Sequence, residues 1–61
     1  MQDLNAAGLA AIAQAARRNV AACLDIAEKL SQQGNRDAAE RLLKLAEDCR
    51  SIARRAEVIG Q

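Results

Sequence analysis

Apolar residues recur along this chain at spacings of three and four, in two runs separated by the polar stretch SQQGNRD at residues 31–37. This spacing is typical of amphipathic α-helices. Proline is absent, and the residues that favour helices dominate both runs: Ala, Leu, Arg, Glu, Lys and Gln. The sequence therefore predicts an all-α chain, an antiparallel hairpin of two helices over about residues 3–33 and 36–59.

The polar stretch carries the signals that end one helix and begin another. Gly34 suits the left-handed residue that follows a helix C-terminus, and Asn35 can cap the second helix with its side-chain oxygen. Asp3 or Asn5 can cap the first helix in the same way. Oppositely charged residues four apart support both helices: Asp25/Lys29, Asp37/Arg41 and Glu40/Lys44.

A seven-residue lettering, a to g, predicts which residues the helices bury. Position a holds Leu9, Ala16, Cys23 and Leu30 in the first helix and Leu42, Cys49 and Ala56 in the second. Position d holds Ile12, Asn19 and Ile26, then Ala38, Leu45, Ile52 and Ile59. We expect a and d to form the seam between the helices, with Ala at e allowing close backbone approach. Leu24 and Leu43, both at b, extend the apolar arc to a flank that we expect to meet a second hairpin.

The composition indicates why a second hairpin is needed. The chain has 61 residues, of which fifteen are Ala and none is aromatic. Chains below roughly 70–80 residues seldom have a core that suffices alone. We therefore expect a homo-oligomer, most simply a dimer forming a four-helix bundle, with this interface: Leu9, Ile12, Val20, Leu24, Ile26, Leu30, Leu42, Leu43, Leu45 and Ile52.

Charge and hydropathy narrow the class of protein. The formal net charge of +1 gives no global field that favours nucleic acid or an anionic membrane. The longest uncharged run, residues 4–16, is too short and too weakly apolar to span a bilayer. Nothing resembles a secretory signal, and two cysteines make no disulfide framework. We expect a soluble cytoplasmic protein with reduced thiols, no membrane contact and no cofactor.

Residues 20–53 carry small and apolar residues at positions that match a known 34-residue repeat. The matching residues are Ile26, Ala27, Leu30, Ala39, Leu43 and Ala46. Cys23, at the position of the repeat's Trp, and Ser51, at that of its Pro, depart from the pattern. This segment resembles a single tetratricopeptide repeat, which would imply a protein-binding hairpin. We interpret the match as packing chemistry common to close helical hairpins.

In overall architecture, a chain of this length that dimerises through one hairpin is similar to the Rop family of plasmid-encoded proteins. No RNA-binding motif of that family aligns with this sequence, so the similarity concerns shape.

The two cysteines, Cys23 and Cys49, fall at core a positions, where a free thiol behaves as a small apolar group. Their different levels in the hairpin argue against a disulfide between them. A dimer would bring four thiols together, so a thiolate metal site is an alternative to simple packing.

The arginines concentrate at the end of the hairpin far from its turn, and form a candidate polyanion site: Arg17, Arg18, Arg50, Arg54 and Arg55. Guanidinium groups bind phosphate and carboxylate in bidentate fashion. Neighbouring carboxylates at Glu47, Asp48 and Glu57 favour instead a solvated face with internal ion pairs. A small nucleic-acid-binding regulator is the alternative function that this cluster predicts.

Two further features leave alternatives open. Asn19 is either a buried key for register and orientation or a water-exposed residue at the bundle edge. The Ala-rich run at residues 6–19 places Gly8, Ala10, Ala11 and Ala15 off the seam, as a neutral surface of small residues. It is either simply a strong helix former or a smooth contact face for another helix.

Catalysis has little support in this sequence. It contains no His and no Tyr, and Ser31 and Ser51 have no base at a recognisable spacing. The sequence predicts a non-catalytic protein-protein interaction or regulatory module that self-associates.

Overall fold

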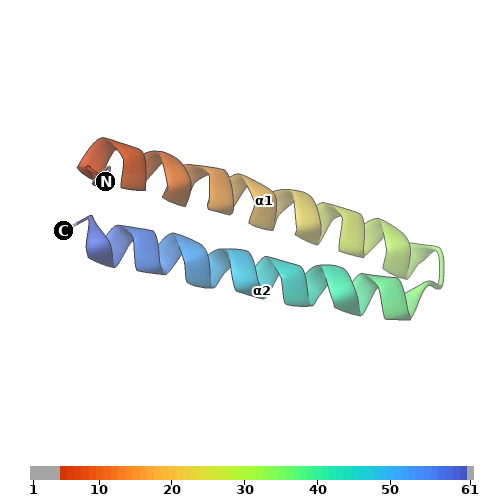
Figure 1. The fold of residues 1–61 in the computed structure, drawn as a ribbon. Helices are drawn as coiled ribbons and strands as arrows, with labels where there is room; N and C mark the ends of the chain where they lie inside the picture. The colour runs from red at the N-terminus through yellow and green to blue at the C-terminus, as the bar shows by residue number, and fades with distance from the viewer. Residues whose placement is uncertain (1–4, 61) are drawn as a thin grey trace.

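The computed structural model describes residues 5–60, which form two antiparallel helices lying side by side along their whole length (Figure 1). Helix α1 spans Ala6–Gln32 and helix α2 spans Arg36–Ile59. The start of α1 and the end of α2 lie together at the end of the hairpin opposite the turn. The molecule is an elongated slab of 46 × 19 × 13 Å. The predicted all-α hairpin is confirmed.

Helix α1 begins later and ends earlier than predicted. Asn5 has an extended backbone, and its Oδ1 accepts a hydrogen bond from the Gly8 amide at 2.7 Å, so the helix begins at Ala6 rather than near residue 3. The alternative cap, Asp3, lies outside the described residues. At the other end Gln33 is the C-cap rather than the last helical residue.

The turn has the geometry that its sequence predicts. Gly34 adopts φ +81°, the left-handed conformation that costs a residue without Cβ least. Its amide donates to the Ser31 carbonyl at 3.0 Å, and the Asn35 amide donates to the Leu30 carbonyl at 2.9 Å. This pair of bonds is a Schellman motif. The Asn35 side chain then caps α2 by accepting from the Ala38 amide at 3.3 Å.

The seam between the helices is made of positions a and e, and the predicted a/d seam is wrong. The buried residues are Leu9, Ala13, Ala16, Val20, Cys23, Ala27, Ala39, Ala46, Cys49, Ala53 and Ala56. Ala46 and Ala53 are only 1% exposed. Because a and e lie four residues apart and are mostly small, the two helices approach closely along these rows. Larger side chains at d do not fit that narrow gap and lie on its rim.

Ion pairs are few on the described residues. The predicted pair Asp25–Lys29 is present at 3.2 Å, whereas Asp37/Arg41 and Glu40/Lys44 are not within ion-pair distance. One pair, Arg17–Glu57, joins the two helices. No helix within residues 5–60 has the length and apolar character needed to cross a membrane.

Candidate interaction surfaces

Moving the seam to a and e places the two remaining apolar positions on opposite faces of the slab. With about 100° between successive residues, d lies about 80° to one side of the a/e midline and b about 80° to the other. Because the helices are antiparallel, each letter falls on the same side of the hairpin in both. The slab therefore has a d face and a b face.

The d face carries most of the exposed large apolar side chains. It consists of Ile12 and Ile26 from α1 and Leu45, Ile52 and Ile59 from α2. These side chains are 38%, 46%, 49%, 50% and 68% exposed, respectively. Asn19 and Ala38 complete the d rows; Asn19 is exposed and Ala38 half-buried. Ile59 was missing from the predicted interface, although its d position in the lettering already identified it.

The b face has a smaller apolar patch set among charges. Leu24 and Leu43 are 38% and 49% exposed. They line a shallow groove of about 410 Å³ near the turn, together with Ala27, Glu28, Ser31, Arg36, Ala39 and Glu40. The apolar patch of this face is thus two leucines bordered by two acidic residues and one basic residue, far less apolar than the d face.

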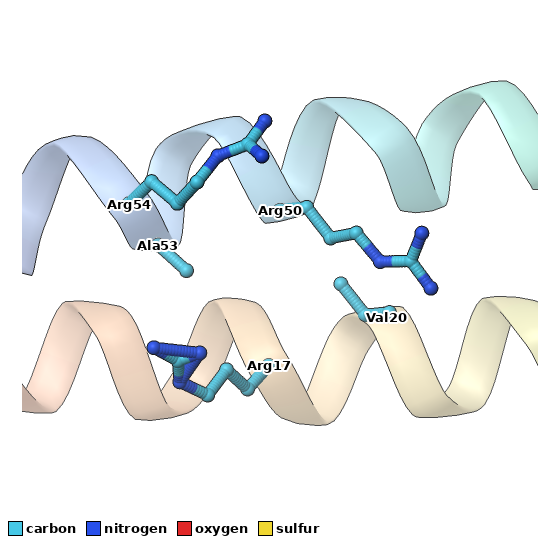
Figure 2. Close-up of a pocket in the computed structure, with 5 residues that line it drawn as sticks. All are labelled: Arg17, Val20, Arg50, Ala53 and Arg54. Atoms are coloured by element: carbon cyan, nitrogen blue, oxygen red, sulfur yellow. The ribbon is translucent and has the colours of Figure 1, made fainter.

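A second groove, of about 310 Å³, lies on the b face nearer the chain ends and is lined by Arg17, Val20, Arg50, Ala53 and Arg54. Figure 2 shows the Arg50 side chain running from α2 toward the gap between the helices, beside Val20, with Arg17 lying along α1 and Arg54 along α2. The predicted five-arginine cluster is therefore divided. Arg18, at c, and Arg55, at g, do not line this groove.

Arg17 also forms an ion pair. Its guanidinium contacts the Glu57 carboxylate on α2. The hydrogen bond from Arg17 lowers the pKa of Glu57, and the same hydrogen bond raises the pKa of Arg17. Among the described residues, Glu57 is the only ion-pair partner of the three groove arginines, so Arg50 and Arg54 carry the groove's uncompensated positive charge.

The predicted interface residues divide into two groups. Leu9 and Val20 are buried inside the single hairpin, and Leu30 and Leu42 are half-buried. The other six keep large exposed areas, four on the d face and two on the b face: Ile12, Ile26, Leu45, Ile52, Leu24 and Leu43. These six are the side chains available to a partner.

The cysteines lie in the seam between the helices. Cys23 and Cys49 are both free and buried, and they form one apolar cluster with Val20 and Ala46, against which Leu42 packs. Within residues 5–60 no group of three or more His, Cys, Asp and Glu side chains is placed to hold a metal ion. A thiolate site would therefore need ligands from another chain.

The Ala-rich first half of α1 supplies small residues to both outer faces. Ala10, Ala11 and Ala15 are exposed, and Gly8 is half-buried beside the Asn5 cap. Ala15 and Gly8, both at g, border the d face. Gly8 and Ala15 of the predicted smooth contact surface therefore continue the d face, whereas Ala10, at b, lies on the opposite face.

In comparisons with known proteins, no family model, no curated protein and no solved structure matches this chain.

Proposed function

We propose that this protein is a non-catalytic interaction module whose hairpin pairs with a second copy of itself through the d face, giving a four-helix bundle. The observation that carries the proposal is the exposure of Ile12, Ile26, Leu45 and Ile52, each between 38% and 50%. Large apolar patches on a small protein are typical of interaction sites. This assignment moves the expected contact away from Leu24 and Leu43, on the opposite face.

The hairpin's own core supports the need for a partner. Seven of its eleven buried residues are Ala, and every large side chain keeps at least 2% of its surface exposed. Full burial of one Leu or Ile side chain contributes about 1.5–3 kcal/mol, and the d face leaves much of that contribution unused. Dimerisation through this face would bury those side chains without any change in the hairpin.

The size of the face suits a second copy. A slab of 46 × 19 Å offers on the order of 900 Å² to a partner of the same shape, close to the ~800 Å² per partner of a standard interface. In a dimer with twofold symmetry, the straight d face of one copy also packs against a d face of the same length. A globular partner would cover only part of it.

The test compares matched pairs of substitutions by sedimentation equilibrium. Leu45→Asp with Ile52→Asp should leave a monomer, because two charges would be buried in the d-face contact. Leu24→Asp with Leu43→Asp is the control on the b face and should leave the dimer intact. Dissociation by the b-face pair alone would overturn the assignment.

A second candidate function is binding of nucleic acid on the b face, which the groove of Arg17, Arg50 and Arg54 favours. In a d-face dimer both of these grooves would point outward. Binding of a labelled RNA or DNA oligonucleotide should then weaken steeply with added salt, since neutralised phosphates release counterions. Arg50→Glu with Arg54→Glu should abolish it, and unchanged binding in that variant would exclude the groove.

A further inference from the structure

The two helices border the d face differently. Position g lies beside d on the outer edge of each helix. In α1 this edge carries the small residues Gly8, Ala15 and Ala22 before Lys29, whereas in α2 it carries Arg41, Asp48 and Arg55. One edge is therefore mostly small and neutral, and the other is long and charged.

Two identical slabs can meet through their d faces in two ways that keep neighbouring helices antiparallel. If the turns lie at opposite ends of the bundle, α1 packs on the partner's α1 and α2 on the partner's α2. If the turns lie at the same end, α1 of each chain packs on the partner's α2. The charges along the edges distinguish these arrangements.

With the turns at opposite ends, like charges meet along the contact between α2 and the partner's α2. Full overlap of the d rows centres the pair on Asn19 in α1 and between Asp48 and Cys49 in α2. Arg41 then lies level with the partner's Arg55, and Asp48 lies beside the partner's Asp48. Like charges directly opposite one another destabilise a contact.

With the turns at the same end, the like-charge contacts between the two α2 helices are absent. The buried cluster of Val20, Cys23, Ala46 and Cys49 fixes which residues of α1 and α2 share a level. At these levels, Arg18 lies within one helical turn of the partner's Asp48. Arg41 lies level with the partner's Lys29, also at g, whose charge is offset by its ion pair with Asp25.

The sizes of the side chains also fit this arrangement. Arg55 lies over the partner's Ala11 and Ala15, where small residues leave room for its long stem. The Asn19 amide comes within reach of the partner's Asp48 carboxylate, which gives this polar residue at d a hydrogen-bond acceptor.

From this complementarity we infer that the second copy packs with its turn at the same end of the bundle, α1 against α2 of the partner, with Arg18 and Asp48 paired twice across the twofold axis. This inference rests on the proposed d-face dimer and specifies its geometry. It makes Arg18 and Asp48 the residues that select the orientation.

Spin-label distances in solution separate the two arrangements. A label on Gln33→Cys, in a Cys23→Ala/Cys49→Ala background, marks the turn end of each chain. Turns at the same end give a distance below about 25 Å, set by helix separation and label length. Turns at opposite ends give about 40 Å, since Gln33 lies fourteen residues from Asn19 at 1.5 Å each. If the cysteine-free chain does not fold, the label is placed in the wild-type background, where both thiols are buried.

A label on Ala21→Cys is the matched control, because it lies near the middle of α1 and is exposed. It should give a short distance in either arrangement and so reports dimer formation itself. A short distance from Ala21 with about 40 Å from Gln33 would overturn the orientation and leave the dimer standing. No interchain distance from either label would overturn both.

Charge reversal provides an independent test. Arg18→Asp and Asp48→Arg should each raise the dimer Kd about two- to tenfold, and the double variant should restore it. Arg54→Asp, on the opposite side of the slab, should leave the Kd unchanged. With the turns at opposite ends, Asp48→Arg would only replace one like-charge contact with another, so an unchanged Kd in both single variants would contradict the inferred orientation.

Discussion

Arg17 of α1 and Glu57 of α2 form the single ion pair that bridges the helices within residues 5–60, far from the turn that connects them. Both side chains are about half exposed, so the pair contributes modestly and is weakened by salt. This pair nonetheless connects the two helices near the open end of the hairpin, where no turn joins them.

The pH dependence of this pair follows from the lowered pKa of Glu57. A carboxylate with a depressed folded-state pKa contributes stability above its unfolded value of 4.5, and that contribution is lost as the pH falls through the folded value. Thermal unfolding should therefore show a slightly lower Tm for Glu57→Gln than for wild type at pH 7. The two Tm values should converge at pH 2–3, and a difference that persists there would contradict the assignment.

The close a/e seam predicts intolerance of larger side chains. Ala46→Leu would force a branched side chain into a position that is 1% exposed, and should lower the free energy of unfolding by about 1–3 kcal/mol. Urea unfolding followed by circular dichroism measures this change. Ala21→Leu, at an exposed position of α1, is the control and should unfold within about 0.5 kcal/mol of wild type. Equal effects of the two substitutions would argue against the a/e seam.

The turn depends on the left-handed conformation of Gly34. Gly34→Ala should destabilise the protein by about 1–2 kcal/mol, because an L-residue is strained at φ +81° even though open space surrounds its Cβ. Urea unfolding again provides the measurement. Gln33→Ala changes the neighbouring residue, whose φ is −83°, and should have little effect.

The buried thiols predict slow chemical modification. Cys23 and Cys49 are at most 9% exposed, so a thiol reagent should react with them only as fast as the hairpin opens. Adding denaturant should raise the rate steeply for both. Rapid reaction of either thiol in native buffer would show that it lies outside the seam.

Much of this fold could be predicted from the sequence because its signals are local. Gly34 and Asn35 identify the turn and the second cap through their own conformational preferences, and the apolar spacing identifies both helices. The Asn5 cap was one of two predicted candidates. The start of α1 was placed too early because helix-favouring residues continue on both sides of the cap.

The seam itself could not be predicted from a generic a/d pattern. Whether Ile12 or Ala13 faces the other helix depends on how closely the two helices approach. That distance is set jointly by the rows of small residues on both helices. Recurrent Ala at e did predict a close approach. The consequence, that Ile12, Ile26, Leu45 and Ile52 are displaced to one outer face, required the structure. The division of the arginines, with Arg18 and Arg55 outside the groove, follows from the same rotation.

The most direct measurement of the central claim is the solution mass of the wild-type chain by sedimentation equilibrium in reducing buffer. Interference optics are needed, because no aromatic residue absorbs at 280 nm. Association of two hairpins through the d face predicts twice the chain mass of 6.5 kDa. A mass of 6.5 kDa at all concentrations would contradict the account, because Ile12, Ile26, Leu45 and Ile52 would then be left exposed in the free protein.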